Sequence, residues 1–187
     1  MEAIVKRIIH EVKQGDEQAF AELVELYKDK VYQVAYRMVG NAHEAQDVAQ
    51  EAFLRAYTNL DRFDVNRKFS TWIFKIATNV AIDRLRKKKP DFYLQDSVNG
   101  SDHLTYESQL AAVEASPDEQ VLTMELQEWV QDEINQLPPK YRIAIVLKYL
   151  EDLSLKEISE ILDMPISTVK TRIHRGREAL RKRMRHV

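Results

Sequence analysis

The sequence contains no cysteine, which excludes a disulfide scaffold, a thiolate metal site and a cysteine nucleophile. Only four glycines and five prolines occur in 187 residues, too few for the many turns of an all-β fold, and the glycines do not cluster as in phosphate-binding loops. No apolar run approaches the roughly 20 residues that cross a bilayer, and the basic N-terminus lacks the apolar stretch of a signal peptide. We therefore expect a soluble protein of the cytoplasm.

Apolar residues make up 44% of the chain and recur at helical spacing between the few glycines and prolines. This pattern predicts an all-α fold with two small helical domains. The first domain is expected at residues 1–90 and the second at residues 117–187. Residues 91–116 show no sustained period and are polar and acidic, so we expect a linker between the domains.

Capping residues mark the expected helices of the first domain. Asp16 precedes a long amphipathic helix that ends at Gly40, and Asn41 with Glu44 forms a capping-box pattern at the start of the next helix. A third long helix is expected from about Phe69 to Lys88. The first domain should therefore contain three long helices.

Charge is segregated along the chain, although the formal net charge is only −2. No Lys or Arg lies between Asp91 and Pro139, and that segment contains eleven acidic residues. Five cations lie at positions 84–89 just before it, and from Lys170 to the C-terminus eight cations accompany a single acidic residue. One charged run is most often a solvated helix face, but cationic patches on both sides of an acidic segment favour a protein that binds phosphates.

The C-terminal residues show the pattern of a helix-turn-helix. Ser154 and Glu157 form a capping box that opens a short helix over Leu155–Leu162, and after a brief turn Ser167 is expected to cap a basic helix that ends near Arg183. The core side of that helix carries Ile166, Val169, Ile173, Gly176 and Leu180. The other side carries hydroxyls and cations suited to reading bases in a major groove, namely Ser167, Thr168, Lys170, Thr171, Arg172 and Arg175. The alternative is an ordinary helical hairpin with a basic solvent face.

Aromatic and cationic residues are interleaved at the start of the third helix. Unstacked bases can lie on aromatic faces while phosphates meet cations, so Trp72 and Lys75 are candidate contacts to a single strand. Trp72 taken alone is more often a core residue of a buried stripe. The amide of Asn79 could hydrogen-bond either a base edge or a neighbouring backbone group.

Other polar residues give no catalytic pattern. Asp47, Gln50 and Glu51 share an exposed helix face, which by default is a solvated surface. The five histidines are scattered, and no spacing gathers metal ligands or places a nucleophile beside its base. We therefore expect neither an enzyme nor a metal or cofactor site.

Four segments in a fixed order carry a resemblance to a known family. They are DVAQEAF at Asp47–Phe53, FSTWIFKIATNVAIDRLRKK at Phe69–Lys88, LPPKYRIAIVLKYLEDLSLKEISEIL at Leu137–Leu162 and STVKTRIHRGREALRK at Ser167–Lys182. Together they resemble the extracytoplasmic-function (group 4) sigma factors of the sigma-70 family, and among these the sigma-W type. The resemblance covers nearly the whole chain apart from the linker.

The resemblance implies a promoter-specificity subunit that joins core RNA polymerase, helps to melt the promoter and is not itself an enzyme. The two domains would be sigma domain 2 and sigma domain 4. Asp47, Gln50 and Glu51 match the face that binds the clamp helices of the largest polymerase subunit. The helices that support the last helix would contact the flap of the second-largest subunit, and the acidic linker would pass through the nucleic-acid channel.

The resemblance also assigns DNA contacts. The residues that match contacts to the −10 element are Phe63, Trp72, Lys75, Asn79, Asp83, Arg84 and Arg86. Phe63 would close over a flipped base of the non-template strand, with Asn79 beside its pocket. Asp83 would read the neighbouring base, and Arg84 and Arg86 would hold phosphates. The last helix, with the six residues named above, would read the −35 element.

One further partner follows from the same resemblance. Members of this family are commonly held inactive by a cognate anti-sigma factor, which is often anchored in the membrane. We expect such a partner here, with the chain held near the membrane when bound to it, and a regulon that responds to cell-envelope stress. No small-molecule substrate is implied.

Two alternatives lie outside this family. A conventional regulator would use its helix-turn-helix on duplex DNA without polymerase, which leaves the aromatic helix at 69–79 unused. An RNA-binding or adaptor protein would use the same mixture of aromatic and cationic residues. A regulator binds its operator tightly alone, whereas a sigma factor binds DNA weakly until polymerase holds both domains at the right spacing.

Overall fold

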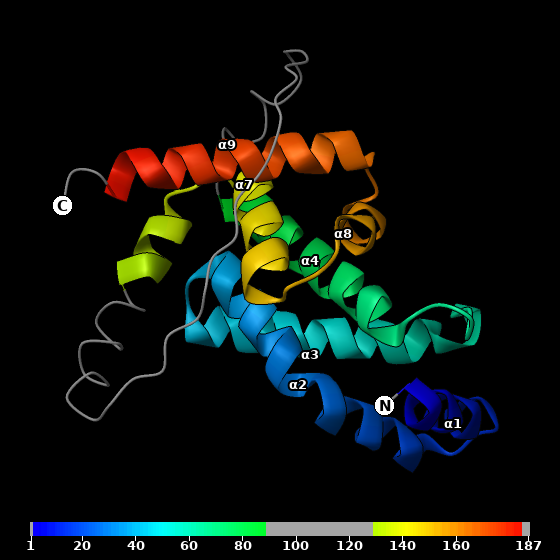
Figure 1. Cartoon of the computed structure of the whole chain (residues 1–187). Coiled ribbons are helices and arrows are strands. Elements are labelled where there is room, and N and C mark those ends of the chain that lie inside the picture. Colours follow the sequence, from blue (N-terminus) through cyan, green and yellow to red (C-terminus); the bar gives the residue numbers. More distant parts are fainter. Residues whose placement is uncertain (1, 89–128, 185–187) are drawn as a thin grey trace, which may run out of the picture.

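The computed structural model describes residues 2–88 and 129–184, and within these ranges it contains helices and no strand (Figure 1). The first part contains α1 (Glu2–Lys13), α2 (Glu17–Val39), α3 (Ala42–Asn59), the 3₁₀ turn η1 (Leu60–Arg62) and α4 (Phe69–Lys88). The second part contains a helix at 129–135, α7 (Pro139–Ile145), the π-helical turn η3 (Val146–Leu150), α8 (Leu155–Leu162) and α9 (Ile166–Met184). The all-α prediction is confirmed, while the expected linker at 91–116 lies outside the described residues.

The ends of α2 follow from its two flanking residues. The Asp16 carboxylate accepts hydrogen bonds from the N–H groups of Gln18 and Ala19, as predicted for an N-cap. Gly40 ends the helix with φ at 72°, a left-handed conformation that favours glycine, and its N–H donates to the Tyr36 carbonyl. The chain can therefore turn sharply from α2 into α3.

The two predicted capping boxes have different outcomes. Ser154 and Glu157 form the complete box that opens α8, with each residue bonded to the backbone of the other. Asn41 accepts a hydrogen bond from the Glu44 N–H, but the Glu44 carboxylate bonds Lys88 and does not turn back to Asn41. The box at the start of α3 is therefore only half formed.

The start of α9 differs from the sequence prediction in two ways. Ser167 does not cap the helix, because α9 already begins at Ile166 and the Val169 N–H donates to the Pro165 carbonyl. A proline suits this place, since it lacks an N–H but keeps its carbonyl as an acceptor. Ile166, predicted on the core side, is 41% exposed, and the core contact of α9 begins one turn later at the buried Val169.

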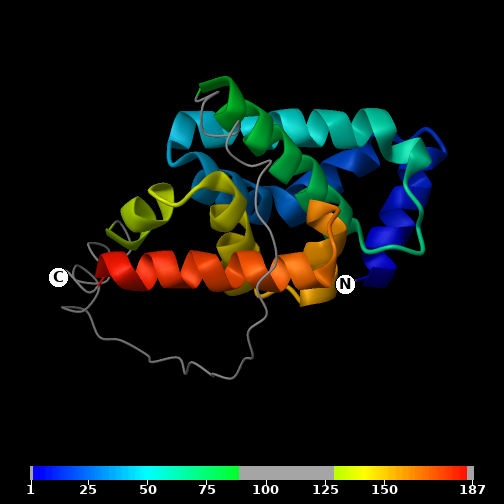
Figure 2. The ribbon, with the colours of Figure 1, turned by 90° about the horizontal axis from the view of Figure 1, so that it is seen from above.

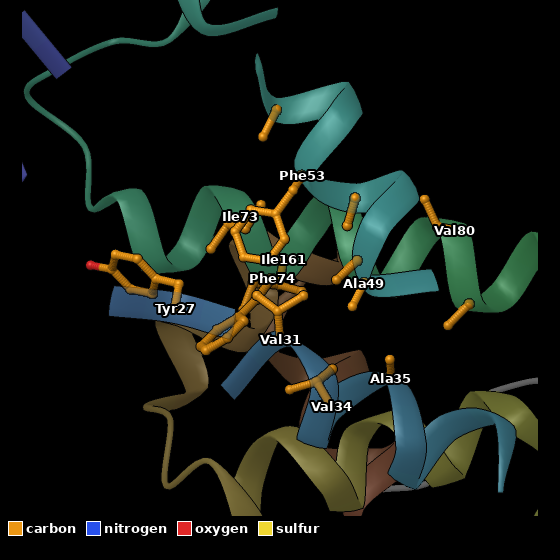
Figure 3. Packing of buried hydrophobic residues seen from close by; sticks show 14 of the residues in the cluster. Tyr27, Val31, Val34, Ala35, Ala49, Phe53, Ile73, Phe74, Val80 and Ile161 are labelled. Carbon is orange, nitrogen blue, oxygen red and sulfur yellow. The ribbon is translucent and has the colours of Figure 1, made fainter. Parts of the chain in front are cut away.

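The two parts pack into one body (Figures 1 and 2). In this body α8 lies against α4, and α7 and η3 lie against α2. The buried apolar side chains form one cluster that runs through both parts, and Figure 3 shows Ile161 of α8 in it together with Val31, Phe53 and Phe74. Ile161 and Phe74 are almost fully buried, so the contact excludes water. Burial of apolar surface therefore holds the two predicted domains together.

A buried arginine connects the two parts where α2 ends. Arg142 of α7 is 7% exposed and donates hydrogen bonds to the carbonyls of Met38, Asn135 and Leu137. The Met38 carbonyl lies in the last turn of α2, where carbonyls lack partners within the helix. The Asn135 side chain also packs on Gly40, where an added Cβ would lie 2.6 Å from its Nδ2. Glycine at position 40 therefore permits both the turn and the close approach of the second part.

Ion pairs flank this contact along α4 and α8. Lys68 Nζ lies 2.9 Å from Glu157 Oε1, and Lys75 Nζ lies 3.8 Å from Asp163 Oδ2. Hydrogen bonds from Lys68 and then from Ser154 lower the pKa of the Glu157 carboxyl to about 2. One carboxylate thus serves both the cap of α8 and the contact with α4.

We predict that Arg142→Met lowers the free energy of unfolding by about 2–4 kcal/mol, because loss of the guanidinium leaves buried carbonyls without this donor. Urea-induced unfolding followed by circular dichroism measures the change. Arg181→Met is the matched control, since it removes the same group from an exposed position of α9 and should alter stability by no more than about 0.5 kcal/mol. Equal unfolding midpoints of the two variants would contradict the role given to Arg142.

Candidate nucleic-acid interface

One face of α4 presents several of the predicted −10 contacts. Trp72, Asn79 and Asp83 recur at helical spacing and so lie on a single stripe of the helix. Asn79 and Asp83 are exposed, whereas Trp72 is half-buried at the start of the stripe. Arg86 lies one turn beyond, with its guanidinium 3.9 Å from the Asp83 carboxylate. A base edge can therefore reach the Asn79 amide from solvent.

Phe63 packs against Trp72 at the start of this stripe. Their ring centroids are 4.9 Å apart, and Phe69 completes the cluster at 5.7 Å from Phe63 and 5.6 Å from Trp72. Phe63 is only 4% exposed, although its predicted role places it over a flipped base. A base stacked on the Phe63 ring would have to displace a neighbouring ring, whereas Trp72 already presents part of its surface.

Two other residues of the predicted −10 set are engaged within the molecule. Lys75 pairs with Asp163 of the second part, and Arg84 donates a hydrogen bond of 2.9 Å to Asp47. The hydrogen bond from Arg84 lowers the pKa of the Asp47 carboxyl below its ordinary value. Each cation would therefore exchange a carboxylate for a phosphate on binding DNA.

A groove between α3 and α4 contains the residues predicted to bind polymerase. Its volume is about 740 Å³, with Asp47, Gln50 and Glu51 on the α3 side and Asp83 and Arg84 on the α4 side. The lining therefore combines acidic, amide and cationic groups. The fold thus brings residues predicted for two different partners, polymerase and DNA, into one groove.

The last helix of the helix-turn-helix has a buried and an accessible side. Val169, Ile173 and Gly176 are buried. Gly176 allows α9 to approach α7 closely, because an added Cβ would lie 2.7 Å from Ile145 Cγ1. Among the predicted readers of the −35 element, Ser167 and Lys170 are exposed. The other four are half-buried, namely Thr168, Thr171, Arg172 and Arg175. All six therefore lie outside the buried core.

Arg172 differs from the other predicted readers. Burial lowers the pKa of its guanidinium below its ordinary value, and the charge interaction with Tyr141 of α7 acts in the opposite direction. Its side chain is half-buried and therefore less accessible to DNA than the exposed Ser167 and Lys170.

Lys13 also contacts this interface, although no pattern in the sequence predicted it. It reaches from α1 to the loop between α3 and α4, with Nζ 2.9 Å from the Phe63 carbonyl oxygen and 3.2 Å from that of Asp61. The acceptors are backbone atoms 50 and 48 residues away, so no pattern of side chains along the chain could reveal the contact.

Metal-ligand clusters and membrane-spanning helices are both absent from the described residues. Within residues 2–88 and 129–184, no group of three or more His, Cys, Asp or Glu side chains could hold a metal ion. No helix in the same ranges is long and apolar enough to cross a bilayer.

Two family models match the chain in the regions that form this interface. The model described as Sigma-70 region 2 matches residues 23–90, which contain α3, α4 and the stripe with Asn79. The model described as Sigma-70, region 4 matches residues 127–180, which contain the helix-turn-helix. The two matches therefore follow the two parts of the fold.

Known proteins are similar to the chain over most or all of its length. It is 59% identical over 187 residues to the ECF RNA polymerase sigma factor SigW of Bacillus subtilis, which covers 100% of both chains. CnrH, solved in complex with the cytosolic domain of CnrY, has the same fold with a TM-score of 0.69, at 23% identity and 97% coverage of both chains. The sigma factor RpoE from Bartonella quintana, solved with the anti-sigma factor NepR, has a TM-score of 0.64 at 20% identity, covering 89% of this chain and 96% of that one. The chain therefore belongs to the family of extracytoplasmic-function RNA polymerase sigma factors.

Proposed function

We propose that the chain directs RNA polymerase to promoters, reading the −35 element with α9 and reading and opening the −10 element with α4. The observation that carries this proposal is the stripe on α4 that has the Phe63–Trp72 pair at its start and the exposed Asn79 two helical turns further on, in a chain that also contains a helix-turn-helix. Unstacked bases bind to surfaces of this kind, whereas a regulator of duplex DNA has no need of one. Sigma domain 2 would comprise residues 1–90, the acidic linker 91–116 and sigma domain 4 residues 117–187.

Binding to core polymerase is proposed for the groove between α3 and α4. Asp47, Gln50 and Glu51 would contact the clamp helices of the largest subunit, and α7 and α8 would contact the flap of the second-largest. This role needs no catalytic residue, cofactor or small-molecule substrate, since the polymerase performs the chemistry. We therefore propose a transcription initiation factor of the cytoplasm, and not an enzyme.

Promoter binding would require the two parts of the molecule to separate. The pair between Lys75 and Asp163 joins the −10 surface of α4 to the turn that precedes α9. The centres of the −10 and −35 elements are about 25 base pairs apart, which is roughly 85 Å of duplex. One docked molecule therefore cannot contact both elements. The 26 residues of the proposed linker at 91–116 can span at most roughly 85–95 Å when fully extended, which is just enough to bridge this distance.

An anti-sigma factor is the proposed regulator of this chain. The support is membership of the family, together with the likeness of the docked fold to a sigma factor solved with its anti-sigma factor. A partner that binds both parts in the docked arrangement would oppose their separation and so keep the chain inactive. A membrane anchor on that partner would also hold the chain near the membrane.

Run-off transcription on fragmented genomic DNA tests the proposed function. Core polymerase is incubated with and without the protein, and the 5′ ends of new transcripts are sequenced. We expect transcripts that appear only with the protein and start downstream of a shared pair of sequence elements. No new transcript, together with tight binding of the protein alone to a duplex site, would favour a conventional regulator.

The two DNA surfaces should fail at different steps of initiation. We predict that Asn79→Ala impairs promoter opening, measured by permanganate reactivity of unpaired thymines, more than it impairs the closed complex. Equal loss of both steps in this variant would contradict the place of Asn79 beside the flipped base.

We predict that Arg175→Ala instead weakens the closed complex by about 1–3 kcal/mol, the value of a bidentate contact to a base edge. Unchanged promoter selection by this variant would remove Arg175 from the readers of the −35 element.

A further inference from the structure

We infer that Lys13 is a positioning residue for −10 recognition, because it fixes the backbone of the loop that carries Phe63. The inference rests on the proposed function, in which that loop lies at the −10 element. Lys13 is the last residue of α1, and its ammonium donates to the carbonyls of Asp61 and Phe63. These carbonyls belong to the peptide groups 61–62 and 63–64, so a single ammonium with several donors orients the peptide groups on both sides of the Arg62–Phe63 segment.

α1 provides a rigid base for the Lys13 side chain. Val5, Ile8 and Ile9 of α1 are buried, and the helix packs on α2. The connection that follows is short and ends at the Asp16 cap of α2. The match to Sigma-70 region 2 begins at residue 23, so this support comes from a helix outside the matched region.

Short-range hydrogen bonds shape the loop itself. The Phe63 N–H donates to the Leu60 carbonyl, and Asp64 accepts from the N–H groups of Asn66 and Arg67. These bonds join residues two or three apart, so they set the local turn but not its position relative to α4. Together with the packing of the Phe63 ring on Trp72, the bonds from Lys13 supply that long-range restraint.

Hydrogen bonds to main-chain atoms leave the Phe63 ring free to exchange partners. When a base enters beside Trp72, the ring can move from the tryptophan to the base while the Phe63 carbonyl stays bonded to Lys13. Because the loop is already ordered before DNA binds, the free-energy cost of ordering it on binding is smaller. Lys13 should therefore affect capture of the single strand and leave duplex binding by α9 unchanged.

The binding test compares Lys13→Met with Lys6→Met in holoenzyme assembled from the full chain and core polymerase. Lys6 is exposed on the same helix, so the control removes the same charge. The probes are a fluorescent single strand with the non-template −10 sequence of a promoter mapped by run-off transcription, and a duplex with its −35 element alone. Lys13→Met should weaken single-strand binding about tenfold and leave duplex binding unchanged. Lys13→Arg should restore most of the single-strand affinity, since a guanidinium can donate to both carbonyls.

The fluorescence of Trp72 reports the position of the loop without DNA. Trp129→Phe leaves Trp72 as the only tryptophan in the sequence, and the Phe63 ring lies against it. In this background, Lys13→Met should shift the emission of Trp72 and increase its quenching by acrylamide, at a temperature well below unfolding. Lys6→Met should leave both unchanged.

Phe63→Ala separates failure of this inference from failure of the proposed function. Unchanged single-strand affinity of Lys13→Met, or an equal loss in Lys6→Met, would overturn the positioning role. If Phe63→Ala loses affinity while Lys13→Met does not, the function stands and the positioning role is wrong. If neither variant loses affinity, the loop has no part in −10 recognition and both statements about it are wrong.

Discussion

The guanidinium of Arg142 is the contact on which the arrangement of both parts depends. Carbonyls in the last turn of a helix lack donors within that helix, and burying them unpaired is costly. Arg142 donates to the Met38 carbonyl at the end of α2 and to the Asn135 and Leu137 carbonyls in its own part of the chain. Because the side chain is buried, it cannot exchange these acceptors for water unless the parts move apart. The place of α7 against α2 in turn sets α8 against α4.

The docked arrangement thus holds the proposed −10 surface of α4 close to α9, the proposed reader of the −35 element, although binding a promoter would require the two to be further apart. Apolar burial, the Arg142 contact and the pairs made by Lys68 and Lys75 all favour the docked arrangement. Each part is small, so docking also adds to the stability of both. In the proposed function, binding to core polymerase supplies the free energy that separates the parts, whereas binding of an anti-sigma factor stabilises the docked arrangement. Both partners then act on a single equilibrium.

Helix ends could be predicted from the sequence because their signals are local. Asp16 and Gly40 act within a turn of their own positions and lie as expected. α1 was not predicted, although its buried apolar residues stand at the same helical spacing as those of the other helices. The burial of Phe63, the carboxylate partner of Arg84 and the reach of Lys13 depend on packing between elements far apart in sequence. Spacing along one helix shows which residues share a face but not what covers that face, so these features of the site could not be predicted.

Locking the docked arrangement tests most directly whether separation is needed for function. The chain has no cysteine, so Gly40→Cys with Asn135→Cys introduces one pair, and Asn135 Cγ, whose place the new sulfur would take, lies 2.8 Å from the place of a Cβ at position 40. Asn135→Cys also removes the amide atoms that this Cβ would meet, and the single Gly40→Cys variant controls for the strain of a side chain at the left-handed φ of position 40. Promoter-specific transcription with core polymerase is compared for the oxidised and reduced double variant and for each single variant. We predict a loss of about tenfold or more on oxidation, with recovery to the level of the single variants on reduction. Full transcription by the oxidised, locked protein would show that the two parts need not separate.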